Sequence, residues 1–182
     1  IIDSSGMKCT TTEGILEVFA AFYENLYDAL KIEPSMAAWA GQSASISAED
    51  VSNALKKLKS GKASGDDQLM AEMLKTDHEG LIDFIAAAFT DILHGSVEVP
   101  AVWCKSRLVI LFKKGDATLP KNYRPIAIIP VLCKLFSGIF LARCKHLLDR
   151  LQGPEQAGFR ADYSCSDIVM FLRMLAEKSE EW

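Results

Sequence analysis

The sequence predicts an α+β fold that is mainly helical and carries one small β-hairpin. Apolar residues recur at helical spacing in several separate segments, whereas one apolar run has the length and aliphatic, β-branched composition of a strand. With 182 residues, 49% of them hydrophobic, the chain can bury a core of its own. A disordered chain is therefore excluded, and no apolar run approaches the ~20 residues of a membrane span.

Two helices are expected in the first part of the chain. Thr10 to Glu13 has the pattern of a capping box, and apolar residues from Ile15 to Leu30 then follow a helical period. A second capping box, Ser47 to Asp50, begins a helix that should stop at Ser60-Gly61. The segment between the two helices has no clear period and predicts a loop.

Residues 59–67 read Lys-Ser-Gly-Lys-Ala-Ser-Gly-Asp-Asp and predict a tight loop. A nucleotide-binding P-loop is excluded because Ala63 stands where that motif needs Ser or Thr. Asp66 and Asp67 are expected to cap a helix over 68–76, since adjacent carboxylates on a loop rarely hold a metal alone. Later helices are expected over 81–93 and 132–151, and a third capping box, Ser164 to Asp167, begins the last one.

The apolar run Arg107–Phe112 breaks into a basic loop, and Arg124 returns before Pro125. A strand, a loop and a return strand over 126–129 would bring Lys113 and Arg124 together at the open end of a hairpin, with Asp116 as the one acidic neighbour. A mobile ammonium and a planar guanidinium together suit phosphate oxygens. The alternative is a solvated basic turn. Trp103, just before the hairpin, is expected to pack beneath it.

Charge is unevenly distributed along the chain. The net charge of −4 argues against nucleic-acid binding by bulk positive charge. The charged residues among positions 1–55 are mostly acidic, whereas those among positions 105–124 are all basic apart from Asp116. The cations of that basic stretch are Lys105, Arg107, Lys113, Lys114, Lys121 and Arg124.

The five cysteines are scattered and lack zinc-ligand spacing, so they predict reduced core thiols. The chain starts at Ile1 and shows no signal-peptide pattern. We expect an internal piece of a longer intracellular protein. The sequence does not distinguish between the nucleus and the cytoplasm as its location.

Several short motifs, taken in order and at their spacing, resemble the N-terminal reverse transcriptase motifs of LINE-type (non-long-terminal-repeat) retrotransposons. They are Lys59 to Asp67, Pro100-Ala-Val-Trp103, Ile110 to Asp116, Asn122-Tyr-Arg-Pro-Ile126, Lys134-Leu135 and Gln156-Ala-Gly-Phe-Arg160. The resemblance implies a partial reverse transcriptase domain over 46–182, the fingers and start of the palm of a right-hand polymerase, preceded by a helix and linker over 1–45.

The same resemblance implies roles for particular residues. Lys113 and Arg124 would contact the triphosphate of the incoming deoxynucleotide. Residues along the template path would be Lys62, Lys114, Gln156, Phe159 and Arg160. The implied partners are an RNA template, a DNA primer, a deoxynucleoside triphosphate and the remainder of the polymerase chain, with no membrane.

The catalytic residues of such a polymerase are not found in this sequence. Phosphoryl transfer needs aspartates that hold two Mg²⁺ ions, and no Tyr-x-Asp-Asp occurs here. No catalytic or metal-binding residue is therefore assigned, Mg²⁺ is expected only for an intact parent, and the chain should bind without catalysing. The alternatives are a non-catalytic nucleic-acid-binding or protein-interaction module, and a decayed relic.

Overall fold

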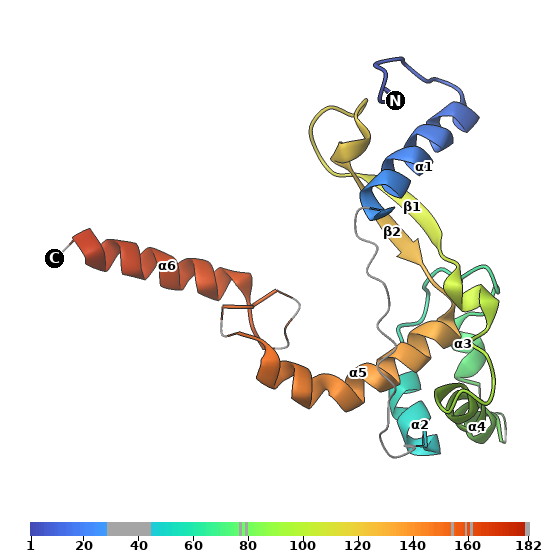
Figure 1. The fold of residues 1–182 in the computed structure, drawn as a ribbon. Coiled ribbons are helices and arrows are strands. Elements are labelled where there is room, and N and C mark those ends of the chain that lie inside the picture. The colour runs from blue at the N-terminus through green and yellow to red at the C-terminus, as the bar shows by residue number, and fades with distance from the viewer. Residues whose placement is uncertain are drawn as a thin grey trace. The chain divides into compact units, whose positions relative to one another are not determined.

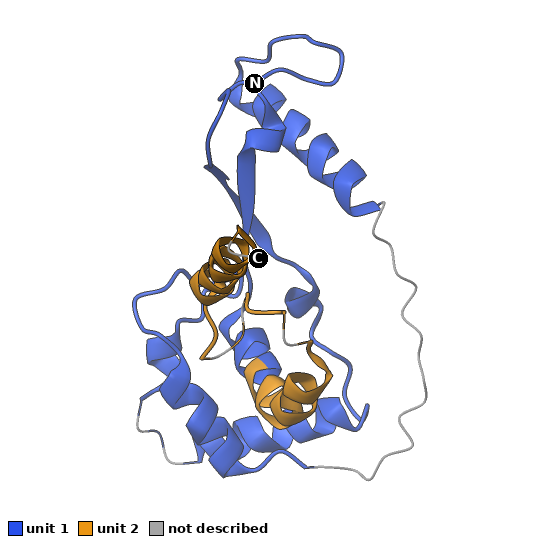
Figure 2. Cartoon of the chain, turned by 90° about the vertical axis from the view of Figure 1, so that its left-hand side faces the viewer, with its two compact units in different colours: residues 1–137 blue, residues 138–182 orange. Residues whose placement is uncertain are grey.

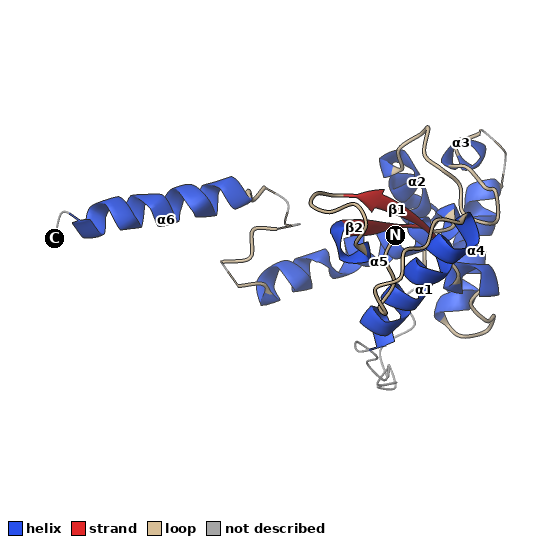
Figure 3. Cartoon of the chain, turned by 90° about the horizontal axis from the view of Figure 1, so that it is seen from above, coloured by secondary structure: helices blue, strands red, loops and turns tan. Residues whose placement is uncertain are grey.

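A computed structural model describes residues 1–28, 45–76, 78, 80–153, 155–158, 160 and 162–180. These residues form two compact units, 1–137 and 138–182, which are described separately (Figure 2). The described elements confirm a mainly helical α+β fold with one antiparallel pair of strands (Figures 1 and 3). The longer elements are α1 (Thr12–Asp28), α2 (Ala48–Lys57), α4 (Leu81–Leu93), β1 (Arg107–Phe112), β2 (Tyr123–Ile128), α5 (Val131–Leu151) and α6 (Cys165–Glu180).

The first helix, α1, begins one residue later than its capping pattern suggests. The hydroxyl of Thr11, rather than that of Thr10, accepts a hydrogen bond from the backbone N–H of Gly14 at 3.2 Å. Its inner face buries Phe19 and Tyr23. The predicted extension to Leu30 lies outside the described residues.

Helices α2 and α4 pack together and form much of the core of the first unit. The predicted capping box of α2 is confirmed, because Ser47 and Asp50 bond each other's backbone N–H groups. Val51 and Leu55 of α2 are buried, as is Phe89 of α4. The predicted bounds of α4 are confirmed as well.

The prediction of a helix over 68–76 is wrong. It shrinks to the single turn α3 (Ala71–Leu74), and Gln68 adopts a left-handed backbone with φ 58°. The Asp67 carboxylate accepts the N–H of Leu69 at 3.3 Å, so it forms a local turn and leaves α3 without a side-chain cap. The short Asx-type turn competes with helix formation at this point.

Strands β1 and β2 form the predicted hairpin in antiparallel register, from Arg107 opposite Ile128 to Phe112 opposite Tyr123. The second strand begins at Tyr123 rather than Ile126. Arg124 therefore lies within the strand, directly opposite Leu111, and not in the preceding loop.

Helix α1 covers one face of this hairpin. The ring of Phe19 meets the edge of the Tyr123 ring with their centroids 5.0 Å apart, and the Tyr23 hydroxyl donates to the Tyr123 carbonyl at 3.4 Å. Phe112, the cross-strand neighbour of Tyr123, contacts the same ring at 5.3 Å. The side chains of Phe112 and Tyr123 thus point toward α1.

Trp103 packs among helices rather than beneath the hairpin. It lies in a short 3₁₀ turn, η1 (Ala101–Cys104), and its ring is 5.8 Å from that of Phe89 and 5.5 Å from that of Phe136. These two rings come from α4 and α5, so Trp103 links the hairpin's leading segment to the helical core.

The second unit contains the rest of α5, a loop and α6. Helix α6 begins as predicted, with the Ser164 hydroxyl accepting the N–H of Ser166 at 3.1 Å. Its large apolar side chains are exposed, among them Val169 and Phe171. No helix in the described part of the chain is long and apolar enough to cross a bilayer.

Candidate nucleic-acid interface

The basic loop of the hairpin is closed by its own backbone and side chains. The N–H of Lys113 donates to the carbonyl of Asn122 at 2.9 Å, and the Asn122 amide donates to the carbonyl of Asp116 at 2.8 Å. Gly115 has φ +90° and lies against the Asn122 side chain, where an added Cβ would be 3.0 Å from the amide nitrogen. The loop therefore positions its lysines on a fixed turn.

The one carboxylate in this loop, that of Asp116, is used within the loop. It accepts hydrogen bonds from the hydroxyl and the N–H of Thr118 at 2.7 and 2.8 Å. These bonds lower the pKa of Asp116 below its ordinary value. Among the described residues, Asp116 forms no ion pair with Lys113, Lys114 or Arg124.

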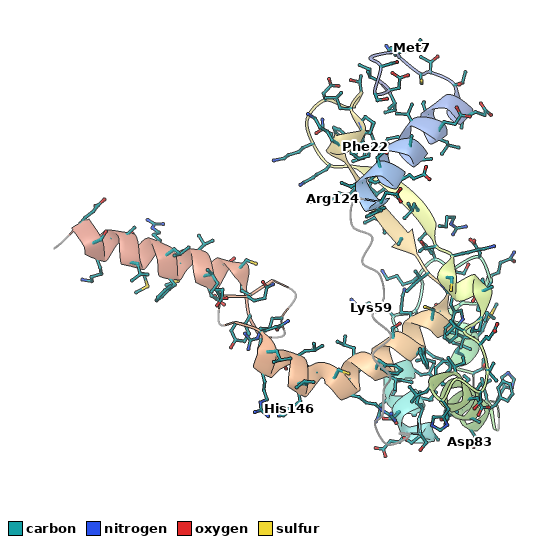
Figure 4. All side chains as sticks on the ribbon, viewed as in Figure 1. Met7, Phe22, Lys59, Asp83, Arg124 and His146 are labelled. Carbon is teal, nitrogen blue, oxygen red and sulfur yellow. The ribbon has the colours of Figure 1, made fainter. Side chains whose placement is uncertain are left out.

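Arg124 lies within β2, and Lys113 directly follows the last residue of β1. Side chains alternate along a strand, so Arg124 points away from the face that Tyr123 presents to α1. Both cationic side chains are exposed, and Arg124 is marked in Figure 4. Both cations thus lie at the end of the hairpin that carries the basic loop.

A second cationic site is a cavity of about 520 Å³ in the first unit. Four lysines and an apolar floor form it, and no acidic side chain does; we call it the lysine cavity. Its cations are Lys57, Lys59, Lys62 and Lys134, and its apolar lining includes Leu58, Leu69, Met70, Ile126, Ile128 and Val131. A site with this lining favours an anion that also carries an apolar surface.

The lysine cavity adjoins the strand that carries Arg124. Ile126, Ala127 and Ile128 of β2 and the following Ile129 all line the cavity. Strand β2 therefore runs from Arg124, near the basic loop, to the wall of the cavity.

Three contacts hold the loop that carries Lys59 and Lys62. The Glu72 carboxylate accepts the N–H of Gly61, which lowers the pKa of Glu72, and the ammonium of Lys75 donates to the carbonyl of Leu58. The Arg107 guanidinium donates to the carbonyl of Ser64 at 3.3 Å. The loop is thereby attached both to α3 and to β1.

The predicted template residues of the second unit are engaged locally. The Arg160 guanidinium donates to the carbonyls of Gly153 and Asp149 at 3.3 and 3.4 Å and stacks 4.1 Å from the centre of the Tyr163 ring. The Gln156 amide donates to the carbonyl of Gly158 at 2.9 Å. Phe159 lies outside the described residues.

Sequence reasoning missed three of the four cavity lysines. Helical spacing assigned Lys57, Lys59 and Lys134 to the outer faces of helices. The cavity arises where segments 57–63 and 69–71 meet the distant segment 126–134, so no local pattern identifies it. In the described ranges, no group of three or more His, Cys, Asp or Glu side chains could hold a metal ion.

No protein-family model matches the chain. It is 27% identical over 182 residues to the "Retrovirus-related Pol polyprotein from type-1 retrotransposable element R1" of Bradysia coprophila, with 96% of this chain covered. It is 28% identical over 65% of its length to the "RNA-directed DNA polymerase from mobile element jockey" of Drosophila melanogaster, and 26% identical over 90% to the "Probable RNA-directed DNA polymerase from transposon X-element" of the same species.

These matches relate the chain to the RNA-directed DNA polymerases of mobile elements. More specifically, they confirm its resemblance to the reverse transcriptases of LINE-type (non-long-terminal-repeat) retrotransposons. The chain spans only 18, 13 and 20% of the three relatives' lengths.

Proposed function

We propose that the chain forms the fingers and the start of the palm of a right-hand reverse transcriptase, and that Lys113 and Arg124 bind the triphosphate of the incoming deoxynucleotide. The observation that supports this proposal is the hairpin itself, which brings two exposed cations to its loop end, where the one carboxylate of the loop bonds Thr118 and forms no ion pair with either of them among the described residues. Phosphate oxygens would complete their hydrogen bonding, with Arg124 offering a planar fork and Lys113 a point charge.

The lysine cavity and Lys114 would bind the phosphates of the RNA template, whose partner strand is a DNA primer. Lys62 was predicted from the loop motif, and its position in a cavity with three further lysines supports a strand-binding role. Gln156, Phe159 and Arg160 are proposed to add template contacts. For Arg160 this contact would use donors that remain after its two backbone hydrogen bonds.

By itself the chain is proposed to bind without incorporating nucleotides. Polymerase chemistry requires carboxylates that hold Mg²⁺, which neutralises the phosphate charge that develops during transfer. The sequence contains no Tyr-x-Asp-Asp, and the described residues hold no suitable ligand cluster. The residues present therefore do not fit a Mg²⁺ site, and no catalytic step is assigned to them.

Titration with a fluorescent deoxynucleoside triphosphate tests the hairpin site. Arg124→Ala and Lys113→Ala should each weaken binding about three- to tenfold, because each removes one charge-assisted contact at an exposed position. Lys8→Ala removes the same charge from an exposed position elsewhere in the first unit and should change the affinity little. Equal losses in all three variants would contradict a specific phosphate site.

Primer extension with Mg²⁺ tests the claim that the chain binds only. No incorporation is expected from this chain, and any incorporation would overturn the claim.

The lysine cavity favours one alternative, a non-catalytic nucleic-acid-binding module. That module would bind single-stranded RNA through Lys59 and Lys62 while showing no affinity for a free triphosphate. The nucleotide titration separates the two functions, since only the polymerase assignment requires Arg124 to matter for mononucleotides.

A further inference from the structure

A larger cavity, of about 720 Å³, lies at the other end of the first unit. It is formed by α1, the segment before it and the loop before β2, and we call it the α1 groove. Its walls are Ile2, Asp3, Ser4 and Cys9 from the N-terminal segment, Gly14, Glu17, Val18, Ala21, Phe22, Asn25 and Leu26 from α1, and Leu119, Pro120 and Lys121 from the loop. Phe22 is marked in Figure 4.

The α1 side of the groove is one continuous helical stripe. Its positions recur every three or four residues from Gly14 to Leu26, over about 18 Å of helix. Val18, Phe22 and Leu26 supply apolar surface, and Leu26 is 49% exposed. Gly14 and Ala21 are small enough to let another backbone approach closely. A stripe of this length and character fits the apolar face of a second helix.

Hydrogen bonds fix the facing walls of the groove. The N–H of Ile2 donates to the carbonyl of Thr118 at 2.8 Å, which ties the N-terminal segment to the hairpin loop. The terminal ammonium of Ile1 donates to the carbonyl of Cys9 at 3.0 Å. The Asp3 carboxylate accepts hydrogen bonds from Ser5 and Met7, so the wall is a closed turn.

The charge around the groove is one-sided. Helix α1 carries four acidic residues and no lysine or arginine, and the only cation in the lining is Lys121 on the opposite wall. Hydrogen bonds from Ser5 and Met7 lower the pKa of Asp3, which therefore remains ionised. This charge would repel nucleic acid and attract cations. The α1 groove thus has the opposite polarity to the lysine cavity.

We propose that the α1 groove binds a basic amphipathic helix of a partner protein. Leucine-like side chains of that helix would lie on Val18 and Phe22, and its lysines or arginines would flank Glu17. This partner site is separate from the proposed nucleotide and template contacts and does not depend on them.

A synthetic leucine/lysine peptide of about four helical turns is the probe, and the free thiol of Cys9 is the reporter. Cys9 lines the groove and is partly accessible, whereas Cys104 and Cys165 are exposed outside it. Bound peptide should slow alkylation of Cys9 at least about fivefold by mass spectrometry, and leave Cys104 and Cys165 unchanged. An otherwise matched leucine/glutamate peptide should give no protection.

Two charge reversals on α1 provide the matched comparison. Glu17→Lys changes the groove lining and should weaken peptide binding about fivefold or more, whereas Glu24→Lys makes the same change on the same helix outside the lining. Both positions are exposed, so thermal melts should confirm that both variants remain folded.

The proposal fails if Cys9 is not protected, if both reversals have equal effects, or if the acidic peptide binds as well. It also fails if single-stranded RNA, and not the basic peptide, protects Cys9.

Discussion

Gly65 lies against the backbone of Pro130 so closely that a Cβ at position 65 would come within 2.7 Å of the Pro130 nitrogen. Pro130 is fully buried at the junction of β2 and α5. This contact fixes the loop that carries Lys62 against the start of the helix that carries Lys134. The spacing of the cavity lysines therefore depends on a residue that has no charge of its own.

Gly65→Ala should destabilise the chain by about 1–3 kcal/mol, because the obstructing atoms belong to the backbone and cannot rotate away. Chemical denaturation measures this change. Gly138→Ala, in α5, is the matched control, since an added Cβ there meets nothing within 4 Å. The control should be neutral or stabilising by about 0.5–1 kcal/mol. Equal destabilisation by both substitutions would contradict the close contact.

Glu72→Gln should loosen the loop between α2 and α3, because a neutral amide accepts the Gly61 N–H more weakly than a carboxylate does. Hydrogen exchange of the Gly61 amide should become faster, while that of α4 should not change. In the unsubstituted chain the same protection should be present above pH 4.5, the ordinary pKa of Glu72, and be lost as the pH falls through its lowered pKa. Protection that persists in the variant would rule out this contact.

Thr118→Val should raise the pKa of Asp116 toward its ordinary value of 3.8, because it removes the hydroxyl that bonds the carboxylate. A carboxyl group whose pKa is lowered by folding stabilises the fold above its ordinary pKa, and this stabilisation disappears as the pH falls through the folded value. The loop of the unsubstituted chain should accordingly loosen only in strong acid. Carbon-detected NMR titration of Asp116 measures the shift, and an unchanged pKa would count against the bond.

Single-stranded RNA binding should weaken with added salt, with a slope of about −0.7 in log K against log salt concentration for each phosphate contact. Lys59→Ala and Lys62→Ala should each make the slope shallower by about that amount. Lys8→Ala should leave it unchanged, since Lys8 does not line the cavity. Fluorescence anisotropy at several salt concentrations gives the slopes, and identical slopes for all variants would exclude the lysine cavity as a strand site.

Local sequence patterns predicted the parts of the fold that local chemistry controls. The capping box at Ser47 and the bounds of α4 follow from hydrogen bonds and apolar spacing within single segments. The helix predicted over 68–76 failed because the Asp67 side chain bonds the nearby Leu69 N–H, a competition that helical spacing does not reveal.

Long-range contacts could not be predicted in this way. The packing of Phe19 on Tyr123 joins residues about a hundred positions apart, and the sequence around neither residue indicates which residue it contacts. The same holds for the lysine cavity, which three separate segments form. By contrast, the hairpin that carries Lys113 and Arg124 was predictable, because its two strands are close in sequence.

The packing of α1 on Tyr123 affects the hairpin cations indirectly. A two-stranded ribbon is marginally stable alone in water, and here an acidic helix braces it from behind. Removal of these contacts would leave Lys113 and Arg124 in the sequence but would no longer hold them in a fixed geometry. The proposed binding of an anion would therefore depend on aromatic packing on the α1 face of the hairpin.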